Sequence, residues 1–226
     1  MDEMSTQEAA KRLGVSQRQI QRLVASHALR GEWTAGRTLL VDALDVNARR
    51  HAAEQARGRP WSSDVSWGAL WMLSGLEAAW LTATQRSRLH HRLGELSVEV
   101  ILARCRKRVS TGRYRAAPSA LVALQRELVL SGASAHEVLN FGLASSSSGV
   151  EGYCLERARL DHVKRLALIV DPRGAVILHV PSRADVIDGR REMPLAVIAA
   201  DLAGSNEVRE REAGLAAMRR LQADLR

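Results

Sequence analysis

The sequence predicts an α+β protein with a small N-terminal head and a larger body. Helix-start signals recur eleven residues apart near the N-terminus, and two apolar, strand-like runs lie on either side of residue 171. A chain of 226 residues exceeds the common size of one domain, so two compact units are expected. We expect the head over residues 1–56 and the body over residues 64–226, helical over 64–108 and mixed over 109–226.

Two capping boxes predict the first two helices of the head. Ser5 pairs with Glu8 in one box, and Ser16 pairs with Gln19 in the other. In this pattern each side chain satisfies a backbone N–H that the helix start leaves without a partner. Gly14 can adopt the left-handed conformation that ends a helix. Two short helices joined by a tight turn have the layout of a helix-turn-helix.

The second of these helices is expected to have an apolar face and a polar, basic face. At about 100° per residue, Ile20, Leu23 and Val24 fall on one arc. Arg can bind guanine, and Gln can bind adenine, through two hydrogen bonds in the major groove. A solvated amphipathic helix is the alternative. The candidate DNA-reading residues of this helix are Ser16, Gln17, Arg18, Gln21 and Arg22.

A β-hairpin is predicted to follow the second helix. Its strands are Leu29–Trp33 and Thr38–Val41, and Gly36 supplies the unusual turn dihedral. Arg37 then lies at the tip, where it is a further candidate DNA contact. Asp42 is a good helix N-cap, so a third helix begins directly after the hairpin. Helix, turn, helix, hairpin and helix occur in the order of a winged helix-turn-helix.

The segments STQEAAKRLGVSQRQIQRLV (residues 5–24) and GRTLLVD (residues 36–42) resemble the head shared by MerR-type regulators and phage excisionases. The resemblance implies that the second helix reads the major groove and that the hairpin touches phosphate or the minor groove. These roles pass to Gln17, Arg18, Gln21, Arg22 and Arg37. The long dimerising helix of MerR-type proteins is not evident, so a sensed small molecule does not carry over, and no cofactor is expected.

The positive charge of the chain is concentrated in its first 130 residues. They hold 20 Lys and Arg against 12 Asp and Glu, whereas residues 131–226 hold 13 of each. An excess confined to one part of a chain favours a polyanionic partner. Within the basic run Arg104–Arg115, we expect DNA contacts from Arg106, Lys107 and Arg108. A helix end followed by an edge strand with protective charges is the alternative.

The body carries no recognisable catalytic motif. No nucleophile elbow or nuclease-like spacing of Asp, Glu and Lys is present, so no catalytic residues are expected. His90 and His91 are adjacent, which is poor metal-ligand spacing on a helix, and no metal site is expected. Cys105 and Cys154 have no nearby cysteine, which indicates ordinary reduced thiols. The chain shows no signal-peptide or membrane-spanning run, so we expect a cytoplasmic protein.

Three structural expectations complete the body. Trp67 and Trp71, four residues apart, are expected in a core. Two apolar strands, Leu166–Val170 and Ala175–Val180, are expected to form a hairpin around the turn between them. Helices are expected to close the chain over residues 194–203 and 206–225.

Four segments of the body, residues 81–89, 113–121, 130–135 and 201–214, resemble actinobacterial helix-turn-helix proteins related to AbiE-type abortive-infection antitoxins. The resemblance implies a head that represses its own promoter and an α+β region that counters a nucleotidyltransferase-like toxin. We therefore expect a sequence-specific DNA-binding transcriptional regulator, the antitoxin of a toxin–antitoxin pair, which binds double-stranded DNA as a homodimer or in tandem. The alternatives are a stand-alone MerR- or excisionase-like regulator and a non-enzymatic scaffold whose basic middle binds RNA or protein.

Overall fold

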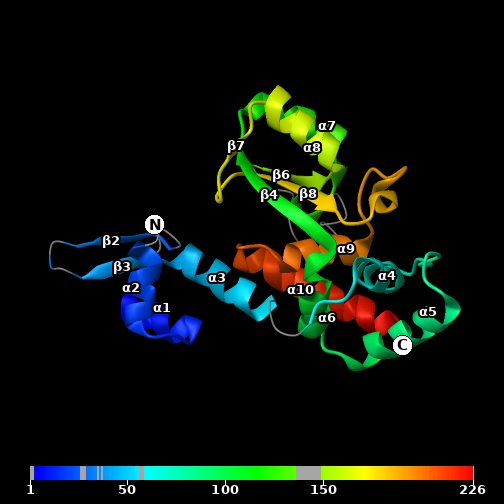
Figure 1. Cartoon of the computed structure of the whole chain (residues 1–226), viewed down its shortest axis with the longest axis horizontal. Helices are drawn as coiled ribbons and strands as arrows, with labels where there is room; N and C mark the ends of the chain where they lie inside the picture. Colours follow the sequence, from blue (N-terminus) through cyan, green and yellow to red (C-terminus); the bar gives the residue numbers. More distant parts are fainter. Residues whose placement is uncertain are drawn as a thin grey trace. The chain divides into compact units, whose positions relative to one another are not determined.

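The computed structural model describes residues 3–25, 29–34, 36, 38–55, 59–135 and 149–225 (Figure 1). The chain divides into two compact units, Met1–Arg57 (unit 1) and Gly58–Arg226 (unit 2). Both units mix helices and strands, which confirms the α+β class expected from the sequence. No helix in these described ranges is both long and apolar enough to cross a membrane.

Unit 1 combines three helices with a small antiparallel sheet. Its elements are β1 (Glu3–Ser5), α1 (Thr6–Leu13), α2 (Gln17–Ala25), β2 (Gly31–Trp33), β3 (Leu39–Asp42) and α3 (Ala43–Gln55). The sheet has the strand order β1-β3-β2, and both neighbours are antiparallel to β3. β1 is an addition to the predicted hairpin. It forms because Met4 pairs with Val41 and both side chains are buried in the core of the unit.

Unit 2 contains the remaining elements. They are α4 (Ser63–Leu73), α5 (Ala83–Glu95), α6 (Val98–Cys105), η1 (Arg106–Arg108), β4 (Val109–Arg115), α7 (Pro118–Glu127), β5 (Val129–Leu130), η2 (Gly132–Ser134), β6 (Val150–Tyr153), α8 (Glu156–Arg165), β7 (Ile169–Val170), β8 (Val176–Pro181), η4 (Ala184–Ile187), α9 (Leu195–Ala203) and α10 (Val208–Asp224).

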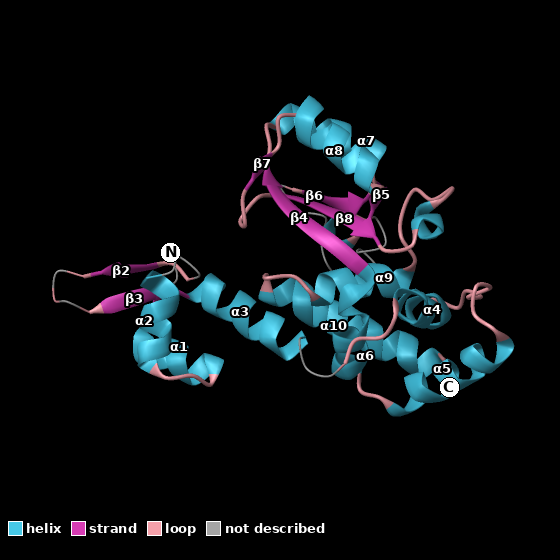
Figure 2. Ribbon diagram, in the orientation of Figure 1, coloured by secondary structure: helices cyan, strands magenta, loops and turns pink. Residues whose placement is uncertain are grey.

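The sheet of unit 2 lies between two layers of helices (Figure 2). Its strand order is β5-β6-β8-β4-β7; β6 and β8 are parallel, and the other neighbours are antiparallel. Side chains alternate between the faces of a strand. One face, with Tyr114, Val150, Val176 and Leu178, packs against α7 and α8. The opposite face carries Tyr153 and turns toward α9.

The prediction of a hairpin formed by the two apolar strands around residue 171 is wrong. The turn itself forms, because the Gly174 N–H donates to the Asp171 carbonyl at 2.8 Å. However, β7 and β8 do not pair with each other. Both pair with β4, which lies between them in the sheet. The backbone of β4 can form hydrogen bonds along both of its edges, so β4 pairs with β7 on one side and with β8 on the other. The residues of the turn do not indicate that β4 is the partner of these strands.

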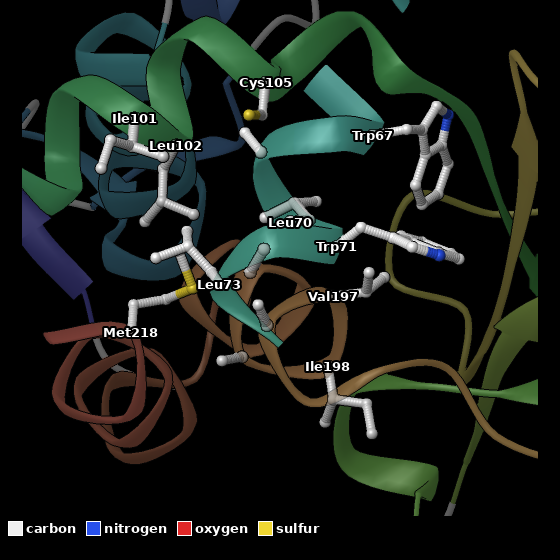
Figure 3. Close-up of a cluster of buried hydrophobic side chains, with 14 of the residues drawn as sticks. Trp67, Leu70, Trp71, Leu73, Ile101, Leu102, Cys105, Val197, Ile198 and Met218 are labelled. Carbon is white, nitrogen blue, oxygen red and sulfur yellow. The ribbon is translucent and has the colours of Figure 1, made fainter. Parts of the chain in front are cut away.

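The expected helical and mixed parts of the body share one core. Helices α4 and α6 pack against α9 and α10, through residues such as Trp67, Ile101, Val197 and Met218 (Figure 3). Trp67 is fully buried and Trp71 is 5 % exposed, so the expectation that these tryptophans form core is confirmed. The expected change from helical to mixed structure at residue 108 therefore marks no boundary between separate cores.

Candidate nucleic-acid interface

Local capping interactions set the geometry of α1 and α2. Ser5 Oγ accepts from the Glu8 N–H at 3.1 Å, and Ser16 Oγ accepts from the Gln19 N–H at 3.2 Å. Gly14 has a φ of 65° and closes α1 by donating its N–H to carbonyls of the last turn. These three interactions fix a tight turn between the helices. The serine caps form as predicted, but the Glu8 carboxylate of the first predicted capping box pairs with Arg12 at 2.7 Å.

Helix α2 is anchored through one face and leaves the other free. Ile20 is fully buried, Leu23 is 8 % exposed, and both lie in the core of unit 1. The opposite face has no hydrogen-bond or ion-pair partner within the described part of the chain. Its exposed side chains are Gln17, Arg18, Gln21 and Arg22. Ser16 is also exposed, but its hydroxyl caps the helix.

Two other arginines of unit 1, Arg12 and Arg30, are tied to the fold by carboxylates. Arg12 Nη2 pairs with Glu8 Oε1 at 2.7 Å on α1. Arg30 binds Asp45 through two hydrogen bonds, from Nε at 2.8 Å and from Nη2 at 2.6 Å, and so links the start of β2 to α3. The guanidinium groups of Arg12 and Arg30 are therefore engaged by carboxylates, whereas Arg18 on α2 has no such partner in the described part of the chain.

The β2–β3 ribbon combines a mostly exposed strand, β2, with β3, whose Leu39 and Val41 are buried in the core of unit 1. Its ladder pairs Trp33 with Leu39, and the Thr34 N–H extends it by donating to the Thr38 carbonyl at 2.9 Å. Trp33 is 65 % exposed. Arg37, expected at the tip, lies outside the described residues.

The basic run in unit 2 does not form one surface. Lys107 is exposed, and Arg106 is half-buried, with Nη1 donating to the Ala103 carbonyl at 2.7 Å. Arg108 is only 7 % exposed, and its Nη2 lies 2.5 Å from Asp201 Oδ1. The expected DNA contact from Arg108 is therefore corrected, because this side chain points into the core and is neutralised there.

Asp201 is the centre of a buried polar cluster in unit 2. Besides Arg108, it accepts from Ser131 Oγ at 2.5 Å and from the Tyr153 hydroxyl at 2.9 and 3.1 Å. Its side chain is 1 % exposed. A buried carboxylate is tolerated only when charge and hydrogen bonds compensate its lost hydration, and here both are supplied.

His179 extends the cluster toward the surface. Its Nε2 lies 2.8 Å from Glu151 Oε1, and its Nδ1 lies 2.9 Å from Thr111 Oγ1. The imidazole also lies against the Tyr153 ring, with centroids 4.9 Å apart. His179 is buried, Glu151 is half-buried and Thr111 is exposed, so the chain of contacts runs from solvent into the core.

The charges of this cluster shift the pKa values of its members. Burial alone would lower the pKa of His179, but the nearby negative charges of Asp201 and Glu151 raise it overall. Burial raises the pKa of Tyr153 well above its usual value, and the adjacent Asp201 carboxylate raises it further. The phenol therefore stays protonated and serves as a donor to Asp201.

The buried cluster brings together the only group of His, Cys, Asp and Glu side chains in the described ranges whose ligand atoms are spaced for one metal ion. Ligand atoms of Glu151, His179 and Asp201 all lie within 4.8 Å of one another. No short motif signals this set, because its members are 28 and 22 residues apart along the chain. The available signal is weaker: each is an ionisable residue within an otherwise apolar segment.

Comparison with known proteins gave no match to any family model, curated protein or solved structure.

Proposed function

We propose that this chain is a sequence-specific DNA-binding regulator of transcription, and that unit 1 is a winged helix-turn-helix whose α2 enters the major groove. The observation that carries the proposal is the free polar face of α2. Arg18 and Gln21 are exposed and have no protein partner in the described chain, whereas Arg12 and Arg30 are held by carboxylates.

The chemistry of this face fits base recognition. Arg and Gln can each make two hydrogen bonds to a purine edge, and residues near the N-terminus of a recognition helix reach the bases first. Gln17 and Arg18 occupy the first turn of α2, and Gln21 and Arg22 the next. The Ser16 hydroxyl, which accepts from Gln19, keeps its own hydrogen to donate to a phosphate oxygen.

Two further groups would add non-specific affinity. In winged helices the ribbon follows the DNA backbone, and Arg37 is the basic residue at its expected tip. In unit 2, exposed Lys107 and half-buried Arg106 are the members of the predicted phosphate-binding set that retain some access to solvent. Phosphate contacts position a protein on DNA but carry no sequence information.

The test is selection of a preferred site from random duplexes, followed by binding of variants to that site and to a scrambled duplex. Arg18→Ala and Gln21→Ala should each weaken specific binding by about 1–3 kcal/mol and leave binding to the scrambled duplex almost unchanged. Equal losses on both duplexes would contradict base readout by α2.

Two substitutions serve as matched controls. Gln19→Ala removes an exposed glutamine from the same helix, outside the proposed reading face. Arg220→Ala removes an exposed arginine from α10 of unit 2. Both should leave the preference for the selected site intact. If Gln19→Ala acts as strongly as Gln21→Ala, the loss reflects the helix as a whole and not the proposed face.

We further propose, on the resemblance to AbiE-type antitoxins, that the regulator controls a toxin–antitoxin operon and that unit 2 opposes a nucleotidyltransferase-like toxin. The experiment is co-expression with a toxin encoded next to this chain. Residues 58–226 alone should restore growth, and residues 1–57 alone should not. Rescue by the head, or by neither part, would remove the antitoxin role and leave a stand-alone regulator.

A further inference from the structure

The buried cluster of unit 2 places three potential metal ligands on three different elements. Glu151 comes from β6, His179 from the neighbouring β8, and Asp201 from α9, which packs against this face of the sheet. Ligands on strands and helices are held more firmly than ligands on loops. On a tetrahedral ion with bonds of about 2.0–2.1 Å, two ligand atoms lie roughly 3.4 Å apart. Binding therefore requires the 2.8 Å contact between His179 Nε2 and Glu151 Oε1 to open slightly. All the ligand atoms already lie within 4.8 Å of one another, so the wider separations have to close.

The groups around these ligands are arranged as supporting partners. A metal-binding histidine usually has its second ring nitrogen fixed by a hydrogen bond, which orients the first toward the ion. Here Thr111 Oγ1 holds Nδ1 of His179 at 2.9 Å, and Nε2 faces the Glu151 carboxylate at 2.8 Å. Asp201 is likewise held by donors: Oδ1 accepts from Arg108 at 2.5 Å and Oδ2 from Ser131 at 2.5 Å, and the Tyr153 hydroxyl lies 3.1 and 2.9 Å from the two oxygens. An ion bound to Asp201 would replace the Tyr153 contact. Both ligands are therefore oriented without an ion.

The backbone also makes room for the third ligand. Gly132 has a φ of 53°, and a Cβ added there would lie 1.9 Å from Glu151 Oε2. The same short helix, η2, holds the strand beside the ligand, because Ser134 Oγ accepts from the Glu151 N–H at 2.8 Å. The Glu151 side chain is 13 % exposed, so an ion can reach the cluster from solvent.

We propose that Glu151, His179 and Asp201 form a binding site for one divalent transition-metal ion in unit 2. One imidazole with two carboxylates suits Zn²⁺ or Mn²⁺ better than Ca²⁺, which prefers six to eight oxygen ligands. The ion takes the place of the hydrogen bond between His179 Nε2 and Glu151 Oε1. Three protein ligands leave a further coordination position for water or an exogenous ligand.

The proposed site lies wholly within unit 2, so it does not depend on DNA binding by unit 1.

The probe is Zn²⁺ alone, titrated calorimetrically into the full-length, untagged chain after treatment with EDTA and dialysis. We expect one ion per chain at saturation and a higher melting temperature for the loaded protein, because a ligand that binds only the folded state stabilises it. His179→Gln and Glu151→Gln should each weaken binding by about 100-fold. Thr111→Val, which removes only the support of His179, should weaken it by about tenfold, as supporting residues typically do.

The matched control is His91→Gln. His91 is an exposed histidine on α5 whose Nδ1 lies 3.2 Å from Glu95, so it represents adventitious surface binding of Zn²⁺. This variant should bind as the original chain does. Absence of stoichiometric binding, binding unchanged by Glu151→Gln and Thr111→Val, or loss of binding in His91→Gln would each overturn the proposal. Near-ultraviolet circular dichroism establishes that the variants are folded; if His179→Gln is not, the other two carry the test.

Discussion

Replacement of Arg108 by Met tests whether the buried ion pair with Asp201 stabilises unit 2. Both side chains are almost fully buried, with exposures of 8 % for Arg108 and 1 % for Asp201, so solvent screens their interaction only weakly. Methionine keeps most of the aliphatic bulk but leaves the carboxylate with only the neutral donors of Ser131 and Tyr153. Removing one partner of a buried pair costs about 3–5 kcal/mol. We expect a loss of this size in the free energy of unfolding of unit 2.

The assay is urea denaturation in the presence of EDTA, followed by tryptophan fluorescence. Four of the five tryptophans lie in unit 2, so the signal reports mainly on that unit. Tyr153→Phe is the graded comparison: it removes one neutral donor to Asp201 and should cost about 1–2 kcal/mol. A loss below about 1 kcal/mol for Arg108→Met, or a larger loss for Tyr153→Phe, would refute the assignment of Arg108 as the compensating charge.

A double substitution separates the pair from the general loss of packing. In Arg108→Met with Asp201→Asn, the buried charge is absent along with its partner. The double variant should therefore lose less stability than the sum of the two single losses, since directly coupled groups are non-additive. Additive losses would mean that the two side chains stabilise unit 2 independently of each other.

Four other outcomes are expected. A plot of log affinity for DNA against log salt has a negative slope, and charge reversal at Lys107 should make it shallower by about 0.9 if Lys107 contacts one phosphate. Charge reversal at half-buried Arg106 should change the slope less. Deletion of residues 1–57 should abolish DNA binding and leave a cooperative unfolding transition for unit 2, which has its own cores. Gly132→Ala should destabilise unit 2 by about 1–3 kcal/mol, measured by urea denaturation, because its φ of 53° disfavours a side chain. Burial lowers the pKa of His162, so as the pH falls the unfolded chain takes up this proton before the folded protein does. The free energy of unfolding should therefore decrease as the pH drops below the unfolded pKa of about 6.5, and His162→Gln should make this decrease smaller.

Much of unit 1 could be predicted because its determinants are local. The caps at Ser5, Ser16 and Asp42 act within three residues, and Gly14 ends α1 through its own backbone conformation. The core of α2 follows from helical periodicity alone. These interactions do not depend on distant partners, so a short window of sequence contains what is needed to place them. β1 was missed because three residues are too few to show a period.

The arrangement of unit 2 depends on distant partners, and here the sequence was misleading. Asp171 forms the expected turn, but the strands on either side pair with β4, more than fifty residues earlier in the chain. Arg108 was assigned to a surface because it lies in a basic run, yet its partner Asp201 is 93 residues away. Neither the turn nor the charge run specifies such a long-range contact.

The residues of the buried cluster share a sequence feature that could be used to find such a cluster where no motif is present. Glu151, His179 and Asp201 each stand within an apolar element: VEGY in β6, VILHVP in β8 and LAVIAADLA in α9. Burying any one of them alone would cost several kcal/mol. An apolar element with a single acidic or basic residue therefore requires compensation from another element, and elements that share this feature are candidates to meet in the fold. The criterion does not say which of these elements meet: only the structure shows that α9 meets β6, through Asp201 and the Tyr153 hydroxyl.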